Sequence, residues 1–589
     1  MNQETKNCQN CKKDFTIEPD DFGFYEKIGV LPPTFCPECR LVRRLSWRNE
    51  RSLYSRNCDL CKKKIITVYN EESNVTVYCD KCWWGDDWDA TDYALDIDFS
   101  KPFMTQVFEL FHKTPVLNLF AFQTINSSYC NMTNDMRNCY LIHDGTYDEN
   151  VSYGSGVFHS KDSMDVTMVR KCELCYEIIT CINCYQTFFS QNCEDCVDVY
   201  FSFGLKGCNN CFGCVNLHKQ SYCIFNEQYT KEKYEEKLKS FELHSYKNIL
   251  AMKEKAYKFW LEFPKKYYFG VQNFNTTGDY IEHSKNAKEC FGVGNVEDSK
   301  FCSFVSNGPV KTTYDFTHYG DGIELAYECL QSGRGVYNLK SSWATWNESK
   351  NSEYCILVVG ATNTFGCVGI RKKQYCILNK QYTKEEYDLL IPKIKKHMND
   401  MPYVDKKGRV YRYGEFFPTE LSPFGYNETT AQEYFYLNKK EVEDKGFNWK
   451  KPIEKDYKIT KDFTELPDSI LQASDSILSE VVACEHKGEC EENCMTAFRI
   501  LSEDLKFYRR MNLPIPHKCP NCRHAERLKL RNPLKLWRRQ CMCGSEGSPP
   551  GTREHFHGLG KCQVEFETSY APDRPEIIYC ERCYQQEVY

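Results

Sequence analysis

The sequence predicts a mainly β protein: a central parallel β-solenoid with turns of roughly 21 residues, flanked by duplicated small zinc modules of the zinc-ribbon or treble-clef type. Two observations support this fold class. Cysteines form CxxC pairs near both ends of the 589-residue chain, and cysteine or serine recurs at a fixed spacing in its middle. The pairs are typical of structural zinc sites, and the fixed spacing is typical of a stacked repeat.

The 36 cysteines fall into three groups: eight before residue 100, eighteen between residues 130 and 376, and ten from residue 484 onward. Neither an export signal nor a membrane-spanning stretch is visible, so we expect a soluble, cytoplasmic protein without disulfides. The net charge of −6 argues against nucleic-acid binding over the whole surface, which leaves local basic patches as the place for it.

These patterns divide the chain into seven regions. They are an N-terminal double zinc module (1–99), a connector (100–129), a first solenoid block (130–234), a helical insertion (235–279), a second solenoid block with a terminal helix (280–400), an extended connector (401–483) and a C-terminal double zinc module (484–589).

The N-terminal module contains two four-cysteine sets with the CxxC…CxxC spacing of a tetrahedral Zn²⁺ site. The first set is Cys8, Cys11, Cys36 and Cys39, and the second is Cys58, Cys61, Cys79 and Cys82. Alternating apolar residues at 65–69 and 75–78 predict a β-hairpin between the two pairs of the second set. Two zinc-binding pairs joined by a hairpin are typical of a zinc ribbon.

The C-terminal module repeats the N-terminal one. The segment Phe35-Cys36-Pro37-Glu38-Cys39-Arg40 matches Lys518-Cys519-Pro520-Asn521-Cys522-Arg523, and further matches follow at a constant offset of 483. The expected third zinc set is Cys490, Cys494, Cys519 and Cys522, with Cys484 or His486 as substitutes. The fourth is Cys543, Cys562, Cys580 and Cys583, with Cys541 or His557 as alternatives to Cys543. We therefore expect about four zinc ions per chain.

The first module also resembles a known family. A CxxC pair, an aromatic residue four positions on, a Phe-Tyr pair and a closing CPxCR occur here as Cys8 to Cys11, Phe15, Phe24-Tyr25 and Cys36 to Arg40. This order is similar to that of small bacterial domains described as probable zinc-binding. The wider arrangement resembles uncharacterised multi-zinc proteins of candidate-phylum bacteria. The resemblance implies zinc binding and a treble-clef or ribbon fold, and it implies no established activity.

Arginines follow each CPxC pair at helical spacing. They are Arg40, Arg44 and Arg48 in the first copy and Arg523, Arg527 and Arg531 in the second. On a helix, residues spaced by four lie on one face, and guanidinium groups bind phosphate through paired donors. The two stripes are therefore candidate nucleic-acid-binding residues. The alternative is that they are solvated or paired with acids.

The central region shows a period of roughly 21 residues. One column of this register reads Cys130, Val151, Cys172, Cys193 and Cys214, and another reads Cys139, Ser160, Cys181, Ser202 and Cys223. Strands rich in Val, Ile, Tyr and Phe stacked in this register predict a parallel β-solenoid with inward thiols acting as small hydrophobes. A rival interpretation is an iron–sulfur site, for which the ferredoxin-type run is incomplete.

The solenoid is itself duplicated. The pattern from Phe212 to Tyr234 recurs at an offset of 153, from Phe365 to Tyr387. The second copy leads into an expected helix, because Thr383 and Glu386 have the spacing of a capping box.

No catalytic motif is found, so we name no catalytic residue and do not expect an enzyme or a small-molecule substrate. The favoured function is a zinc-binding scaffold whose arginine stripes dock RNA or another nucleic acid. One alternative is a protein–protein scaffold with purely structural zinc and an acidic protein partner. A second alternative is an iron–sulfur redox protein that uses the central cysteines. No membrane partner is expected.

Overall fold

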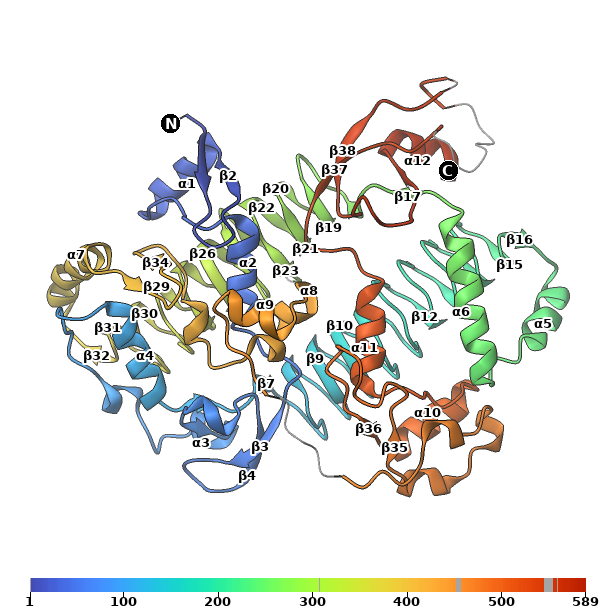
Figure 1. Ribbon diagram of the computed structural model, residues 1–589, viewed down its shortest axis with the longest axis horizontal. Helices are drawn as coiled ribbons and strands as arrows, with labels where there is room; N and C mark the ends of the chain where they lie inside the picture. The colour runs from blue at the N-terminus through green and yellow to red at the C-terminus, as the bar shows by residue number, and fades with distance from the viewer. Residues whose placement is uncertain (1, 307, 452–456, 545–554, 559) are drawn as a thin grey trace.

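The computed structural model describes residues 2–306, 308–451, 457–544, 555–558 and 560–589. The chain is rich in strands, with 30% of residues in strands and 25% in helices. Two stacks of short parallel strands lie side by side, and small modules and helices pack around them (Figure 1). None of the helices in these ranges is both long and apolar enough to span a bilayer.

In the first stack, residues twelve positions apart in the sequence pair in parallel, and we call each such twelve-residue repeat a coil. Thr167 pairs in parallel with Ile179, Ile179 with Gln191, and Gln191 with Phe203. The predicted period of 21 is therefore wrong. The strands are β7 (Ala121–Phe122), β8 (Asn131–Asn134), β9 (Tyr140–Thr146), β10 (Ser152–Phe158), β11 (Thr167–Arg170), β12 (Tyr185–Phe188), β13 (Val197–Tyr200), β14 (Asn209–Phe212), β15 (Ser221–Ile224) and the antiparallel β16 (Glu227–Gln228).

Each coil consists of three-residue steps. Every third residue points inward and is buried, as at Cys172, Cys175 and Ile178, and the residue before each inward one adopts a left-handed φ, as at Leu174 and Glu177. The two sets of residues that were aligned at a spacing of 21 are all buried. This follows because 21 is a multiple of three, so each set contains only inward positions. The predicted burial of the central cysteines is confirmed, because all eighteen are buried.

A ladder of amide side chains marks the register of successive coils on the outside of the first stack. Asn126 donates to Asn138, Asn138 to Asn150, and Asn150 to Asp162, at 3.4, 3.1 and 2.9 Å. Stacked amides of this kind stabilise in-register parallel strands. The ladder holds neighbouring coils at one alignment.

The second stack is less regular, and its coils vary in length. Gly278 pairs with Cys290, twelve positions on, whereas Val296 pairs with Val310, fourteen positions on. Strands β22, β24, β26 and β25 close into a ring of parallel pairs. The strands are β18 (Gly270–Val271), β19 (Gly278–Glu282), β20 (Lys285–Lys288), β21 (Cys290–Gly294), β22 (Val296–Lys300), β23 (Ser303–Val305), β24 (Val310–Lys311), β25 (Tyr314–Thr317), β26 (Ile323–Ser332), β27 (Tyr337–Lys340), β28 (Trp343–Thr345), β29 (Lys350–Glu353), β30 (Thr362–Phe365), β31 (Gln374–Ile377) and the antiparallel β32 (Lys380–Gln381). The short strand β17 (Lys265–Lys266) precedes this stack and pairs with residues 578–579 of the C-terminal module.

Each stack is followed by helices. The predicted capping box is confirmed: Thr383 Oγ1 accepts from the Glu386 N–H at 3.2 Å, and Glu386 accepts from the Thr383 N–H at 2.9 Å. The helices are α5 (Lys231–Ser240) and α6 (Tyr246–Leu261) after the first stack and α7 (Lys384–Asp400) after the second; the connector that follows holds β33 (Tyr403–Val404), β34 (Val410–Tyr411), α8 (Thr430–Tyr434) and α9 (Lys439–Asp444).

The terminal modules are small hairpins followed by helices. The predicted hairpin between 65–69 and 75–78 is wrong, because β4 pairs with β3, and β5 pairs in parallel with β6. The N-terminal elements are β1 (Glu4–Asn7), β2 (Asp14–Ile17), α1 (Pro19–Ile28), α2 (Pro37–Leu45), β3 (Tyr54–Asn57), β4 (Lys64–Thr67), β5 (Val77–Tyr78), α3 (Asp80–Trp84), α4 (Phe103–Lys113) and β6 (Val116–Leu117). The C-terminal ones are β35 (Val482–Ala483), β36 (Ala497–Phe498), α10 (Ser502–Met511), α11 (Pro520–Lys529), β37 (Trp537–Gln540), β38 (Glu565–Thr568), β39 (Ile578–Tyr579) and α12 (Glu581–Val588).

The first part of each terminal module packs against the stack that is more distant from it in the sequence. Helix α2 packs against β25 and β26 of the second stack, and α11 packs against β11 of the first (Figure 1). The two halves of the chain are therefore interlocked.

Candidate metal centres

Among the described residues, four groups of four cysteines have their sulfur atoms within 4.8 Å of one another, close enough to hold one metal ion each. The groups are Cys8, Cys11, Cys36 and Cys39; Cys58, Cys61, Cys79 and Cys82; Cys484, Cys494, Cys519 and Cys522; and Cys541, Cys562, Cys580 and Cys583. All 36 cysteines are free thiols. Four sulfurs at this spacing suit a tetrahedral ion.

The four groups share one backbone hydrogen bond, in which the third cysteine donates its N–H to the sulfur of the first. The donor–acceptor distances are 3.3 Å for Cys36 to Cys8, 3.3 Å for Cys79 to Cys58, 3.2 Å for Cys519 to Cys484 and 3.2 Å for Cys580 to Cys541. This geometry identifies Cys484 as the counterpart of Cys8, and Cys541 as the counterpart of Cys58.

Two of the predicted ligands therefore lie beside these groups. Cys490 Sγ is 3.7 Å from Cys522 Sγ, but Cys484 occupies the first position. Cys543 Sγ lies 2.7 Å from His555 Nδ1, and Cys541 occupies the first position of the fourth group. The other fourteen predicted cysteines belong to the four groups.

Cys484 takes the place predicted for Cys490, and Cys541 takes the place predicted for Cys543. Both were difficult to predict because each is far in sequence from the next cysteine of its group. Nine residues lie between Cys484 and Cys494, where the N-terminal sets have a CxxC pair, so the spacing alone predicts Cys484 only as a substitute ligand. Cys541 is likewise far from Cys562 along the chain. A segment rich in Gly, Ser and Pro, residues 544–551, lies between Cys541 and Cys562, and its residues 545–551 are outside the described part of the chain.

Each group includes the start of a helix. The third cysteines are the N-cap residues of α2, α3, α11 and α12, and all have extended backbone. The N-terminal end of a helix carries free N–H groups and a partial positive charge, which stabilise a thiolate. A metal ion bound there would fix the helix start to the loop that carries the first two cysteines.

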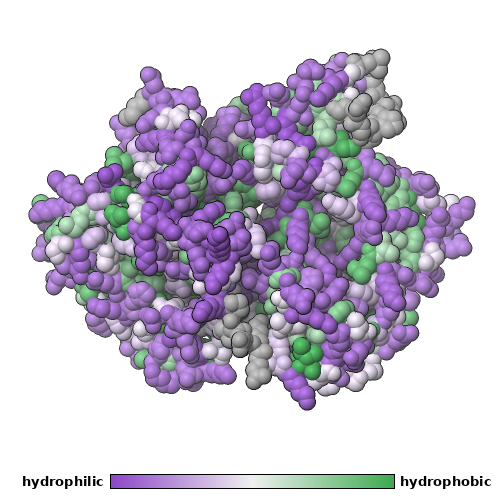
Figure 2. Space-filling model, in the orientation of Figure 1, coloured by the Kyte–Doolittle hydropathy of each residue, from purple (hydrophilic) through white to green (hydrophobic). Residues whose placement is uncertain are grey.

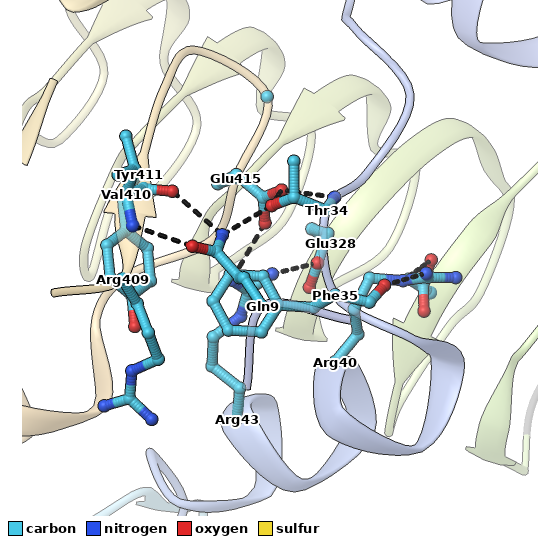
Figure 3. Close-up of polar contacts among 12 residues, drawn as sticks. Gln9, Thr34, Phe35, Arg40, Arg43, Glu328, Arg409, Val410, Tyr411 and Glu415 are labelled. Atoms are coloured by element: carbon cyan, nitrogen blue, oxygen red, sulfur yellow. Dashed lines mark hydrogen bonds and ion pairs between the residues drawn. The ribbon is translucent and has the colours of Figure 1, made fainter. Parts of the chain in front are cut away.

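The arginines after the cysteines pack against acidic side chains of the stacks. Arg40 Nε donates to Asp315 Oδ2 at 2.8 Å, and Arg44 Nη1 donates to Asp315 Oδ1 at 3.0 Å. Figure 3 shows Arg43 of the same helix between Glu328 and Glu415. Burial alone would lower the pKa of Arg40, but Asp315 together with Tyr25, Tyr327 and Glu328 raises that pKa well above its usual value. Arg40 is therefore charged in the fold, whereas burial raises the pKa of Asp315 and Arg40 and Arg44 oppose that shift.

The second copy makes the same contacts on the other stack. Arg523 Nε donates to Asp165 Oδ2 at 2.8 Å, and Arg527 Nη1 donates to Asp165 Oδ1 at 3.0 Å. Arg527 Nε reaches Thr167 Oγ1 at 3.1 Å, as Arg44 Nε reaches Thr317 Oγ1 at 3.1 Å. An Asp-x-Thr segment of each stack is thus the acceptor for the two arginines of a crossing helix.

The predicted nucleic-acid stripes are consequently not surface features. Five of the six arginines are buried, and Arg531 is half-buried beside Tyr434, whose hydroxyl accepts from it at 2.7 Å. Arg48 donates to Asp144 Oδ1 at 3.2 Å. The acid-paired alternative therefore holds for the five buried arginines. The outer face in Figure 2 is largely hydrophilic, with small hydrophobic areas.

The two halves differ beside these contacts. On the second stack, the chain around Gly414 covers Tyr354, whose hydroxyl accepts from the Gly414 N–H at 2.7 Å. On the first stack, the corresponding place is a cavity of about 320 Å³ between α6 and aromatic residues that include Tyr176 and Phe201. A second cavity, of about 530 Å³, lies beside Cys490.

The central thiols donate to backbone carbonyls inside the coils. Cys181 Sγ contacts the carbonyl oxygen of Ile179 at 3.4 Å, and the same contact to the residue two positions earlier recurs along the stack. Burial raises the pKa of Cys139 to about 11 and that of Cys130 to about 12, so these two thiols stay protonated. Hydrogen bonds with Cys184 and Cys193 instead lower the pKa of Cys196 to about 4. Protonated thiols suit packing, whereas a metal binds the thiolate.

Sequence reasoning missed the acceptors Asp165 and Asp315. A signal was present, since Asp165-Val166-Thr167 and Asp315-Phe316-Thr317 share the Asp-x-Thr pattern in the two copies of the stack. It also missed His555, which the structure places against Cys543.

No protein-family model matches this chain, and no curated protein is significantly similar to it.

Proposed function

We propose that the protein is a non-catalytic scaffold in which structural zinc ions hold the terminal modules on a parallel β-solenoid core formed by the two stacks. One observation carries this proposal: the arginine that docks each crossing helix directly follows a metal-ligand cysteine. Arg40 follows Cys39, and Arg523 follows Cys522. A zinc ion at the helix start would therefore set the position of the arginine that reaches the stack.

Zinc is the metal proposed, because four thiolates in CxxC-type loops satisfy its preference for a tetrahedral, sulfur-rich site. The chemistry of such a closed site is structural, since no position is left for a substrate. The intrachain pairing of the arginines favours this scaffold over a scaffold that docks nucleic acid through the same residues.

Metal analysis of the purified protein tests the zinc sites. We expect at least four zinc ions per chain, one for each four-sulfur group. Two or fewer would contradict the proposal. Colourless protein is expected as well, whereas a brown protein would indicate iron–sulfur clusters instead.

A pair of variants separates metal binding from docking. Cys39→Ser should lose one zinc ion and free the N-terminal module, so that limited proteolysis removes it. Arg44→Ala should keep every zinc ion and free the same module, because its contact with Asp315 is lost. A module that stays protected in both variants would show that neither zinc nor the arginine holds it.

A further inference from the structure

The fourth zinc group lies against a second set of ligand atoms. Cys543, His555, His557 and Cys583 place one sulfur or ring nitrogen each within 4.8 Å of one another. Cys583 belongs both to this set and to the group of Cys541, Cys562 and Cys580. We propose that the C-terminal module binds two zinc ions that share the Cys583 thiolate as a bridge. This inference rests on the proposed zinc function and adds a fifth ion to it.

The ligand chemistry suits zinc. Cys543 Sγ lies 2.7 Å from His555 Nδ1 and 3.5 Å from His557 Nε2. Cys543, His555 and Cys583 are buried, so their polar atoms need partners. Two thiolates and two imidazoles form one of the common tetrahedral zinc sites.

An outer partner orients one histidine. His555 Nε2 lies 3.0 Å from Glu587 Oε2, which leaves Nδ1 to face the sulfurs. Metal-binding histidines typically donate their other N–H to a carboxylate in this way. The same loop is fastened to α12, because the Phe556 N–H donates to Gln586 Oε1 at 2.9 Å and the Arg582 guanidinium lies 3.7 Å from the Phe556 ring centre.

The extra ligands come from an insertion. In the N-terminal twin, Cys58 and Cys61 are separated by two residues, whereas twenty residues separate their counterparts Cys541 and Cys562. Cys543, His555 and His557 all lie within that insertion. The insertion thus supplies three ligands and takes the fourth from the four-sulfur group.

Sharing a thiolate also limits the buried charge. Five thiolates against two doubly charged ions leave one net negative charge, whereas a single ion in a four-thiolate group leaves two. A lower net charge reduces the cost of burial. The bridge therefore lets two ions occupy a small module.

Metal content of the full chain is the first test. Wild-type protein should contain five zinc ions, and His555→Ala/His557→Ala should contain four. His159→Ala, an exposed histidine of the first stack, is the matched control and should keep five. Four ions in wild type with no loss in the double variant would overturn the fifth site and leave the proposed function intact. A content of two or fewer would contradict the proposed function itself.

A milder variant covers the case in which the double variant fails to fold. Glu587→Gln keeps all ligands but removes the carboxylate that orients His555. We expect one of the five ions to bind about 10- to 100-fold more weakly in chelator competition. Five ions of unchanged affinity would contradict the assigned site.

The bridge has its own signature. Protein loaded with ¹¹³Cd should give five resonances, two of them split by scalar coupling through Cys583 Sγ. Five unsplit resonances would overturn the shared thiolate.

Discussion

At the residue scale, the arginines of α2 and α11 are the most informative side chains. Arg527 and Asp165 are both almost fully buried, and Asp165 comes from a distant part of the chain, beside strand β11 of the first stack. Removal of one partner of a buried ion pair leaves a charge without water or counter-charge. Loss of the Arg527–Asp165 pair should therefore destabilise the fold by more than the loss of its hydrogen bonds alone.

Arg527→Ala should lower the free energy of unfolding by about 3–5 kcal/mol, because the Asp165 carboxylate stays buried and loses a partner. Arg538→Ala is the control, since the Arg538 side chain is 80% exposed in its pair with Glu565 and should cost about 1 kcal/mol or less. Urea denaturation of the two variants measures both. Equal losses would contradict the importance of the buried pair.

His318 predicts a pH effect. It is buried against Phe304, with ring centres 4.9 Å apart, and burial together with the nearby Arg48 lowers its pKa well below the usual value. The folded protein therefore keeps His318 neutral, while the unfolded chain takes up a proton below about pH 6.5. Stability from this residue is thus lost as the pH falls.

His318→Phe should remove that loss. Between pH 7.5 and 5.5 the wild type should lose about 1 kcal/mol more than the variant. Both proteins have the same cysteines, so acid release of zinc cancels in the difference. Parallel pH profiles for the two proteins would show that His318 is protonated in the fold.

At the scale of elements, the coil was harder to predict than the zinc modules. Its inward residues recur every third position, so any multiple of three aligns small residues, and 21 was one such multiple. The left-handed positions hold Asn and Asp but also Leu, Tyr and Phe, as at Leu174, Tyr153 and Phe189. Left-handed backbone usually occurs at glycine or asparagine, so its occurrence at these larger residues could not be predicted from the sequence.

The inward thiols predict how the coil tolerates substitution. Ser190 and Ser202 occupy inward positions and donate to the carbonyl two residues earlier at 2.8 Å, as Cys181 does at 3.4 Å. Cys181→Ser should therefore change stability by about 1 kcal/mol or less. Cys181→Leu should cost about 1–3 kcal/mol or more, because the narrow coil has no room for the larger side chain. Thermal unfolding compares the two, and equal midpoints would show that the interior is not closely packed.

The metal groups were predictable where the spacing was short and failed where it was long. CxxC pairs identified twelve of the sixteen grouped cysteines, since two residues between cysteines leave few other geometries. Cys484 and Cys541 lie outside such pairs, and their place is set by a backbone N–H that tertiary structure brings to each sulfur. The helical spacing of the arginines was also predictable, but their acceptors lie on distant segments that no local pattern connects to them.

At the scale of the whole molecule, two duplications are superimposed. The modules repeat at an offset of 483 and the ends of the stacks at an offset of 153, so each half of the chain holds one module pair and one stack in a different order. The equal distances of Arg40 to Asp315 and Arg523 to Asp165 show that the same contacts are made in both orders. The two halves therefore repeat the same contacts between helix and stack, although module and stack follow each other in opposite order along the chain.

The crossing of α2 and α11 gives the two halves of this one chain the connectivity of a domain-swapped dimer. A break between Glu262 and Phe263 should give two fragments, each with a stack that lacks its own arginine helix and an arginine helix that lacks its stack. Co-expressed, residues 1–262 and 263–589 should copurify as a one-to-one heterodimer, and Asp165→Ala should weaken it from one fragment while Asp315→Ala weakens it from the other. Fragments that fold and stay apart would contradict this. In the intact chain, the peptide link between the halves keeps two mutually dependent partners at equal number. Two separate chains that exchange helices would have no such guarantee.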